Sequence, residues 1–430
     1  MKKTIFLTSS ILMLAATIFC YSCSAQKASA GTAHKHKTSK KGFYFLFLSD
    51  VHLATNITQS AYGQDAGTDL WGACKGKIDS ILKSANPPAF ILYTGDIPEH
   101  GGIYDTSLRN TNIGNLLTDL HGLAAVKHIP LFYLPGNNDG LGGDYCLFST
   151  QNGRTPFSLV QGYTPYPYQP FNVPQTRSGK GAYMISDANL AAGYYAAHVM
   201  PGLRIISLNS VIWSSQICGK CPVPENCTAQ PGDGDLQMAW LQQQLADAAK
   251  AGDKVYLAMH IPPGADAYAS SNSPGSPVYM WKNTGWQDQF LAAVARYRKT
   301  VAGMFYGHTH MDEFRLLYDS TNTHFTQVAM SCPGISPMFG NNPGFKLVTV
   351  NAGSKLPTDF MTCYATVGPV VWQQPYRFSQ QAGVKKGLSI YDALRQMTPA
   401  QRNAVLNATY TVKHGTATYD TLGMYVKWIK

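Results

Sequence analysis

The sequence predicts an α/β fold, and three observations lead to this prediction. Five short apolar runs, rich in β-branched and aromatic residues and closed by glycine or proline, have the composition of buried strands. Segments between them repeat apolar residues every three or four positions, as amphipathic helices do. Hydrophobic residues make up 45% of the 430 residues and charged residues only 13%, which excludes a disordered or coiled-coil protein and allows a large buried core.

Each of the five predicted strands is followed by side chains that can bind a metal ion. The strands and these residues are 43–48 with Asp50 and His52, 89–94 with Asp96, 130–134 with Asn137, 255–259 with His260, and 301–306 with His308 and His310. One such residue alone would more often be a turn former, a helix cap or a core histidine. Because ligands gather at one edge of an α/β sheet, five in succession favour a shared site.

Glycine stands directly before three of these residues, Asp96, Asn137 and His308. A residue without a Cβ lets the backbone turn close to a bound ion. The glycines therefore strengthen the prediction of a metal site at the strand ends.

The segments between the strands carry helical patterns. Residues 75–82 and 115–126 are predicted helices, and Asp235 is predicted to cap a third helix that ends before Gly252. The apolar face predicted for this third helix consists of Leu236, Trp240, Leu241 and Leu245. Alternation of strand and helix is typical of the α/β class.

The metal-binding pattern stops after about residue 352. Ser389 begins a helical pattern, and residues 398–401, Thr-Pro-Ala-Gln, form a capping box with proline at the first helical position. Residues 353–430 are therefore predicted to form a partly helical extension.

Residues 1–23 have the features of a bacterial export signal. Lys2 and Lys3 form a basic start, and an apolar stretch runs from Ile5 to Tyr21 before small residues. The alternative is an uncleaved transmembrane anchor. We expect an exported protein, which is periplasmic, an outer-membrane lipoprotein or secreted.

Two forms of the mature N-terminus are compatible with this signal. Cys23 follows a small residue and suits the lipid-modified first residue of a lipoprotein, which would contact a membrane surface through its lipid anchor. Cleavage after Ala25 or Ala30 would instead release a soluble protein. Residues 24–42, rich in Lys, Ser, Ala, Thr and His, are predicted to be a flexible basic linker.

Seven cysteines follow Cys23, at positions 74, 146, 218, 221, 227, 332 and 363. Export permits disulfides, but an odd number leaves at least one thiol unpaired, and the connectivity stays open. Cys218, Cys221 and Cys227 lie in one short segment. A local disulfide is favoured over a zinc site there, because no fourth ligand is evident nearby.

Taken in order, the motifs Asp-x-His, Gly-Asp, Gly-Asn-x-Asp, His and Gly-His-x-His resemble those of the calcineurin-like metallophosphoesterases. Residues 94–100, 260–264, 305–310 and 341–345 resemble the acid sphingomyelinase branch of that superfamily. The resemblance covers about residues 43–350. It implies two packed mixed β-sheets flanked by helices, with a catalytic domain at residues 43–352 and the extension 353–430 packed beside it.

The resemblance also implies two divalent metal ions. Asp50, His52 and His310 would hold one ion, Asn137, His260 and His308 the other, and Asp96 would bridge them. Carboxylate, amide and imidazole ligands without thiolate suit zinc, manganese or iron better than calcium or copper, with zinc preferred. Two divalent ions and two carboxylates leave a charge of about +2, which favours an anionic phosphoester substrate.

The implied reaction is hydrolysis of a phosphodiester or phosphoanhydride by a metal-bound hydroxide. His100 is the candidate proton donor for the leaving oxygen, and the alternative is a loop histidine that holds its own turn. Family members commonly carry histidine after the metal-binding asparagine, but this chain has Asn138, which donates a hydrogen bond to phosphate and cannot act as a general acid.

Asn138 leaves the substrate open among sphingomyelin, another phospholipid, a nucleotide and polyphosphate, because endopolyphosphatase-like relatives carry a similar asparagine. The alternative from another class is a catalytically weak, metal-bearing surface protein that binds phospholipid or polyphosphate. Two insertions, 162–171 and 265–281, are candidate substrate loops. The net charge of +10 suits anionic substrates or membrane surfaces, and without a nucleic-acid motif no specific nucleic-acid partner is predicted.

Overall fold

The computed structural model describes residues 42–101, 106–160, 172–177, 179–219, 221, 227, 233–271, 277–282, 284–385, 387–415 and 421–429. The predicted export signal, the linker up to residue 41 and the insertion 162–171 lie outside these residues. Among the described residues, no helix is both long and apolar enough to cross a membrane.

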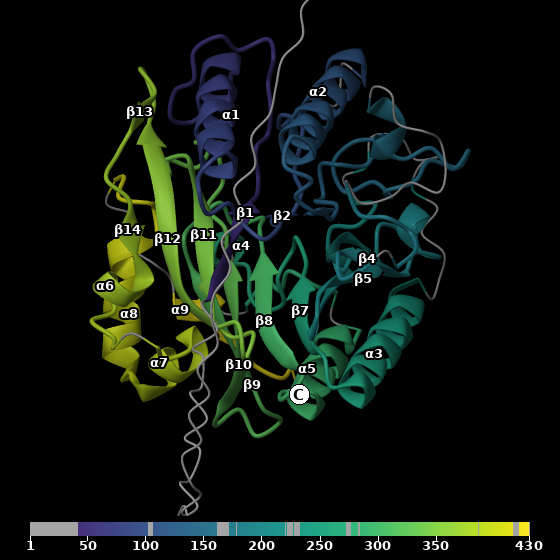
Figure 1. Ribbon diagram of the computed structural model, residues 1–430, viewed down its shortest axis with the longest axis vertical. Coiled ribbons are helices and arrows are strands. Elements are labelled where there is room, and N and C mark those ends of the chain that lie inside the picture. The colour runs from purple at the N-terminus through teal and green to yellow at the C-terminus, as the bar shows by residue number, and fades with distance from the viewer. Residues whose placement is uncertain are drawn as a thin grey trace, which may run out of the picture. The chain divides into compact units, whose positions relative to one another are not determined.

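Two mixed β-sheets form the centre of the fold (Figure 1). The first has the order β13-β12-β11-β1-β2-β3, with β14 paired to β12, and the second has the order β15-β9-β10-β8-β7-β6-β5-β4. Strands of the first sheet are β1 (Phe43–Leu48), β2 (Ile91–Tyr93), β3 (Leu131–Tyr133), β11 (Gly344–Val350), β12 (Pro357–Thr366), β13 (Val371–Trp372) and β14 (Tyr376–Arg377). Those of the second are β4 (Tyr183–Ser186), β5 (Tyr195–Met200), β6 (Leu203–Ser207), β7 (Lys254–Ala258), β8 (Val301–Tyr306), β9 (Phe314–Tyr318), β10 (Phe325–Ser331) and β15 (Tyr425–Val426).

The five predicted strands are confirmed as β1, β2, β3, β7 and β8. Strands β1, β2 and β3 run parallel, and so do β7 and β8. Parallel neighbours end at the same edge of their sheet, so the polar residues that follow them come together.

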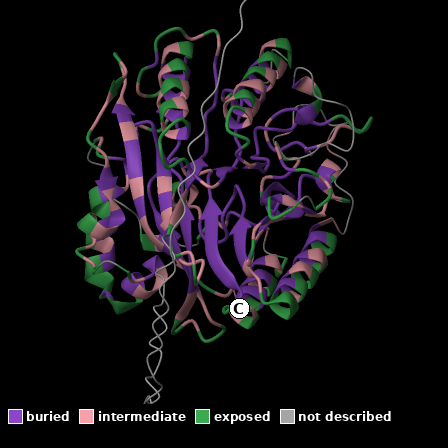
Figure 2. Cartoon of the chain, viewed as in Figure 1, coloured by how far each residue is buried: buried purple, intermediate pink, exposed green. Residues whose placement is uncertain are grey.

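Aromatic side chains fill the space between the two sheets. Phe45 on β1 lies 5.2 Å from Phe305 on β8 and 5.8 Å from Tyr256 on β7, measured between ring centroids. All three residues are buried, and Figure 2 shows β7 and β8 coloured mostly as buried. The expected packing of two mixed sheets face to face is therefore confirmed.

Helices cover the outer faces of the sheets. They are α1 (Thr68–Leu82), α2 (Thr106–Ala125), α3 (Asp233–Ala251), α4 (Ala267–Ser271), α5 (Trp286–Arg296), α6 (Phe378–Gln381), α7 (Ile390–Gln396), α8 (Pro399–Thr409) and α9 (Thr421–Met424). Apolar residues of α1 and α2 share a core with β1–β3, and those of α3 and α5 share one with β6–β8. Short 3₁₀ helices lie at Pro156–Leu159, Leu190–Ala192 and Ser210–Trp213.

Two details predicted for the helix α3 are wrong. The helix begins at Asp233, so Asp235 lies in its first turn and does not cap it. Leu236 is 65% exposed, because it lies about 140° around the helix from Leu241 at 3.6 residues per turn. Leu241 and Leu245 of the predicted face are confirmed as buried, and the other buried residues of the helix are Gly234, Gln237, Met238 and Ala248.

The chain after residue 352 contributes to both sheets. Strands β12, β13 and β14 extend the first sheet, and β15 pairs with β9 of the second. The predicted helix starts are confirmed, since Ser389 caps α7 and Thr398 forms a capping box with Gln401 at the start of α8.

Two disulfides hold the segment around residue 218. Cys218 pairs with Cys227, which confirms the local disulfide, and Cys221 pairs with Cys146, which lies 75 residues earlier. The free thiols of Cys74, Cys332 and Cys363 are buried. The longer disulfide ties this segment to the loop that follows β3.

Candidate metal centre

The ends of β1, β2, β7 and β8 are joined by backbone hydrogen bonds. Asp50 N donates to Gly95 O at 2.9 Å, and Gly307 N donates to His260 O at 3.1 Å. Asp50, after β1, also links the two sheets, because its carboxylate oxygens accept hydrogen bonds from His308 N, after β8, at 2.9 and 3.1 Å. The polar residues after the strands of both sheets are thereby held in one place.

All seven predicted metal-binding residues converge at this edge. Potential ligand atoms of Asp50, His52 and Asp96 lie within 4.8 Å of one another, as do those of Asp96, His260 and His308. His310 Nε2 lies 3.2 Å from His52 Nε2 and 3.6 Å from Asp50 Oδ1. Asn137 Oδ1 lies 3.1 Å from His260 Nε2. Asp96 belongs to both groups, so the cluster is suited to two metal ions.

The distances between these atoms fit a shared coordination shell. Two atoms that bind one zinc ion at about 2.0–2.2 Å with a tetrahedral angle lie roughly 3.3–3.6 Å apart. Here Asp96 Oδ2 lies 3.4 Å from His52 Nε2, within this range, and 3.2 Å from His260 Nε2, just below it. The side chains are therefore already spaced as ligands of a small divalent cation.

Three of the histidines have their Nδ1 atoms engaged by backbone carbonyls. The contacts are His52 to Pro98 O at 3.0 Å, His260 to Thr94 O at 2.7 Å, and His310 to Ser336 O at 3.4 Å. Because a carbonyl only accepts, each Nδ1 carries the hydrogen in these contacts. The Nε2 atoms that face the cluster are the ones left to bind metal.

Five of the seven residues have left-handed backbone conformations. The φ angles are 50° at Asp50, 46° at His52, 59° at Asp96, 72° at His308 and 59° at His310. For a residue with a side chain, such a conformation costs about 1–3 kcal/mol of free energy. It persists where the surroundings enforce it, and it is frequent at functional sites.

Glycines allow the close approach of the strand ends. A Cβ on Gly136 would lie 2.1 Å from Asp96 Oδ1, and one on Gly307 would lie 2.1 Å from Ser49 Oγ. Gly95 has a φ of 90°, and its Cβ would lie 2.2 Å from Gly136 N. Glycine is therefore required at these positions for the expected close approach of the backbone, because any side chain would push apart the loops that carry the cluster.

The electrostatics of the cluster favour a cation. Burial alone would raise the pKa of Asp96, but the charges and hydrogen bonds of His260 and His52 hold this pKa well below its usual value. Burial alone would lower the pKa of His52 and of His260, but Asp96 and the neighbouring carboxylates raise each pKa to about 9. The buried carboxylate of Asp96 thus draws positive charge to the position between the two histidines.

The other side chains of the cluster have shifts caused chiefly by burial. Burial, opposed by the charge of His260, raises the pKa of Asp50 to about 6. Burial and the charge of His260 lower the pKa of His308 to about 3, and burial and the charge of His52 hold the pKa of His310 well below its ordinary value. His308 and His310 therefore offer neutral imidazoles, the form that binds metal.

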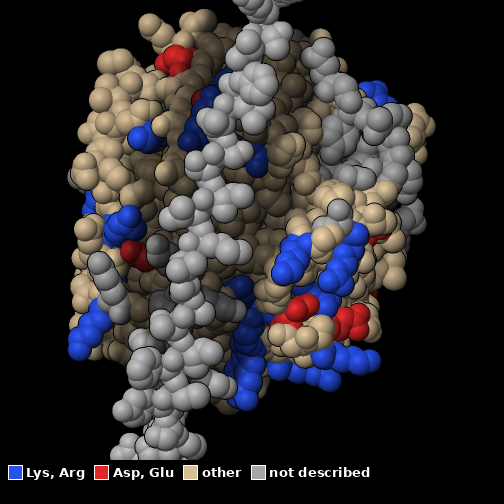
Figure 3. Space-filling model, in the orientation of Figure 1, with Lys and Arg blue, Asp and Glu red and all other residues tan. Residues whose placement is uncertain are grey.

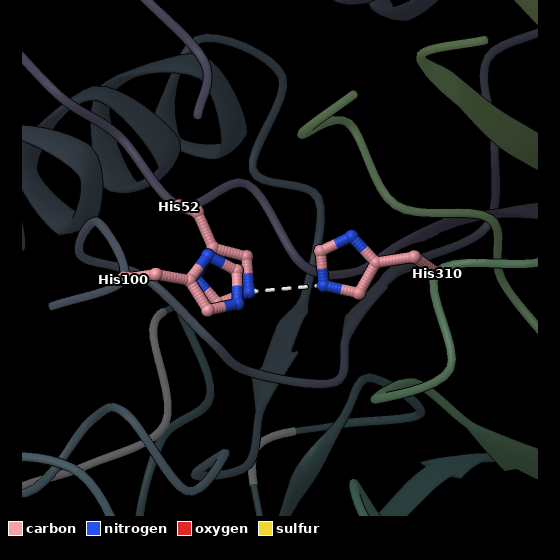
Figure 4. A group of neighbouring side chains, drawn as sticks. All are labelled: His52, His100 and His310. Atoms are coloured by element: carbon pink, nitrogen blue, oxygen red, sulfur yellow. Dashed lines mark hydrogen bonds between the residues drawn. The ribbon is translucent and has the colours of Figure 1, made fainter. Parts of the chain in front are cut away.

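His100 lies beside this cluster and is oriented by Asp65. Its Nδ1 lies 2.7 Å from Asp65 Oδ1, and its backbone N donates to Asp65 Oδ2 at 2.7 Å. The His100 ring stacks on His52 with centroids 3.7 Å apart and planes inclined by 17°. Figure 4 shows this stack, with Nε2 of His52 turned toward His310.

A ligand role for His100 is geometrically possible, since it forms a further group with His52 and His310. His100 is, however, more accessible than its neighbours, with 26% of its side chain exposed, and its Nδ1 is held by Asp65. These features favour the proton-donor role over the ligand role.

Asn138 is buried against Asp96. Its backbone N and its Nδ2 donate to the two oxygens of Asp96 at 2.8 and 3.0 Å. Asp139 accepts hydrogen bonds from three backbone amides, at Asp96, Ile97 and Gly136. It thereby fixes the Asp96 loop to the Asn137 loop.

Three residues near the cluster were not singled out by the sequence pattern. Asp65 orients His100, Asp144 accepts a hydrogen bond from the Asn137 amide at 2.8 Å, and Phe339 packs edge-on with its centroid 4.7 Å from His310. Phe339 is 52% exposed and stands at the margin of the cluster. All three lie in loops, where neither strand nor helix periodicity marks a position as inward-facing.

Two packed mixed sheets with an aspartate and histidine cluster at their strand ends define a metal-dependent phosphoesterase. The family model for calcineurin-like phosphoesterase matches residues 43–312, and the chain belongs to this family. It is accordingly a phosphoric ester hydrolase.

Relatives are found in the acid sphingomyelinase branch. Sphingomyelinase phosphodiesterase D of Dictyostelium discoideum is 29% identical over 80% of this chain and 69% of the relative. Sphingomyelin phosphodiesterase 1 of Caenorhabditis elegans is 25% identical over 78% of this chain and 54% of the relative. Cyclic GMP-AMP phosphodiesterase SMPDL3A of Rattus norvegicus is 26% identical over 71% of this chain and 65% of the relative. The match thus spans between about half and two-thirds of these relatives.

Proposed function

We propose that the protein is an exported phosphodiesterase that uses two divalent metal ions, most simply zinc, with manganese and iron as alternatives. The observation that carries this proposal is the pair of ligand groups that share Asp96. Asp50, His52 and His310 are assigned to one ion, and Asn137, His260 and His308 to the other. Two such ions, when bound, lower the pKa of a water and stabilise the charge that develops on phosphate oxygens.

The residues around the ions have separate roles in this proposal. His100 gives a proton to the leaving oxygen from Nε2, because its Nδ1 is held by Asp65. Asn138 holds Asp96 through two hydrogen bonds and has no proton to give as an acid. Phe339 offers an exposed apolar surface beside the reacting groups.

The substrate class proposed is a phosphodiester, in keeping with relatives that are named for sphingomyelin and for a cyclic dinucleotide. The substrates in these two names differ in the leaving group. Asn138, which cannot act as a general acid, bears on which leaving group this protein prefers. On the face seen in Figure 3, lysine and arginine form several separate groups and no single continuous surface.

A substrate panel tests the proposal. Purified protein is loaded with zinc or manganese and assayed with bis-p-nitrophenyl phosphate, sphingomyelin, a cyclic dinucleotide, nucleoside triphosphates and polyphosphate. Metal-dependent cleavage of at least one diester is expected. Binding of phospholipid or polyphosphate without turnover of any substrate would favour the alternative of a surface-binding protein.

A further inference from the structure

The contact between Asp144 and the assigned metal ligand Asn137 indicates a role for Asp144. Asn137 Nδ2 donates to Asp144 Oδ1 at 2.8 Å, while Asn137 Oδ1 lies 3.1 Å from His260 Nε2. An amide has two ends of opposite character, and only its oxygen can bind a cation. What holds the nitrogen end therefore decides which end faces the cluster.

We propose that Asp144 is a positioning residue, which orients the Asn137 amide so that its oxygen faces the second metal ion. This inference rests on the proposed function. An ionised carboxylate accepts hydrogen bonds and has none to donate. A flipped Asn137 would set its oxygen against Asp144 and its NH₂ group against the ion, so the carboxylate excludes that orientation.

The loop that carries Asp144 is held in place on several sides. Tyr145 N donates to Asn137 O at 2.8 Å, and Cys218 N donates to Tyr145 O at 3.1 Å. The Cys146–Cys221 disulfide fixes the next residue. A side chain on such a tethered loop keeps its direction, as a positioning role requires.

The Arg109 side chain holds the beginning of the same loop. This buried guanidinium donates to the backbone oxygens of Asn138 and Gly140, the latter at 3.2 Å. The assigned metal ligand Asn137 and the positioning residue Asp144 are thus seven positions apart on one loop, which these contacts hold in place. A change at Asp144 should consequently reach the ion through Asn137 without loosening the turn itself.

The test compares metal affinity among full-length variants. Wild type, Asp144→Ala and Asp144→Asn are stripped with chelator and titrated with zinc against a competing chelator, and bound zinc per chain is measured. Asp247→Ala is the control, because Asp247 accepts from Gln243 on the exposed surface of α3. Partners that orient a ligand typically change metal affinity 10–100-fold.

We expect two zinc ions per wild-type chain and one weakened site in Asp144→Ala, by about 10–100-fold. Asp144→Asn should lie between the two, because its side-chain oxygen still accepts the Asn137 hydrogen but its NH₂ group would also allow the flipped amide. Equal affinity in wild type and Asp144→Ala would overturn the positioning role alone. A wild-type chain that binds no zinc or manganese would overturn the proposed function as well.

The melting temperature of the metal-free proteins separates positioning from folding. A positioning residue predicts similar values for metal-free wild type and Asp144→Ala. A large drop in Asp144→Ala that Asp144→Asn shares would assign Asp144 a structural role and contradict the inference.

Discussion

Single residues explain how a buried polar cluster persists in this protein. Asp96 accepts from Asn138 twice and lies 3.2 Å from His260 and 3.4 Å from His52. Such a carboxylate is stable in the interior only when opposite charge and hydrogen bonds surround it. Asn138, His260 and His52 therefore stabilise the buried carboxylate of Asp96, and Asp96 stabilises these side chains in return.

Asp96→Ala is predicted to remove both metal ions and the activity together, because one carboxylate serves both ligand groups. Elemental analysis of purified protein measures the metal, and circular dichroism checks the fold. His308→Ala serves for comparison and should deplete one ion preferentially. A folded Asp96→Ala protein with wild-type metal content would contradict the bridging role.

His100 and Asn138 allow a prediction about the leaving group. General acid catalysis contributes about 10²- to 10⁴-fold, mostly for poor leaving groups such as alkoxides. His100→Ala should therefore slow alkyl diesters more than aryl diesters, and Asn138→His should help alkyl diesters more. Rates for paired alkyl and aryl substrates, with metal content held equal, measure this. Equal effects on both classes would show that neither position 100 nor position 138 handles the proton of the leaving group.

At the scale of elements, short strands act as supports for the residues at their ends. Strands β2 and β3 have three residues each, yet both are fully buried and pair in parallel. The loops after them touch through Gly95 and Gly136, which leave no room for a side chain. The spacing of the cluster is thus set by backbone contact between loops.

Gly136→Ala is predicted to lower both thermal stability and metal affinity, since its Cβ would lie 2.1 Å from Asp96 Oδ1. Gly76→Ala in α1 is the matched control, because nothing lies within 4 Å of its Cβ. The control should gain about 0.5–1 kcal/mol of stability from helix propensity. Melting curves with and without zinc check both variants. Wild-type behaviour of Gly136→Ala would show that the two loops can separate without loss.

At the scale of the whole molecule, a buried ion pair joins the two sheets. Lys346 Nζ on β11 lies 2.7 Å from Asp312 Oδ1, just before β9. Asp312 also accepts from Thr362 on β12 and from Tyr376 on β14. The chain after residue 352 therefore supports the loop that carries His308 and His310.

Lys346→Met is predicted to destabilise the fold by about 3–5 kcal/mol, because it leaves Asp312 buried without its cation. Chemical denaturation of the metal-free protein measures the loss. The exposed Lys83, paired with Asp79 on α1, provides the control, and Lys83→Met should change stability by about 0–1 kcal/mol. A similar small effect at both positions would show that the hydroxyl donors alone satisfy Asp312.

The export proposal concerns the whole chain and rests on its first residues. If Cys23 is acylated, the protein should fractionate with membranes, and Cys23→Ser should release it or block processing. Mass spectrometry of the mature N-terminus decides the matter. An unmodified terminus at Gln26 or Gly31 would establish cleavage without a lipid anchor.

The class of fold and the identities of the clustered residues follow from the amino-acid sequence alone. Apolar runs that end in Asp, Asn or His are local patterns, and the spacing of their residues is enough to recognise them. Helix α3 shows the limit of such patterns, since the exposure of Leu236 depends on which face meets the sheet.

The surroundings of the cluster, in contrast, depend on the three-dimensional packing of the chain. The contacts of Asp65 with His100 and of Lys346 with Asp312 join residues 35 and 34 positions apart, and Cys146 pairs across 75 residues. Long-range contacts of this kind depend on how sheets and loops pack, and no local periodicity encodes them. Asp144 lies only seven residues from Asn137, but a loop has no repeating geometry from which its direction could be predicted.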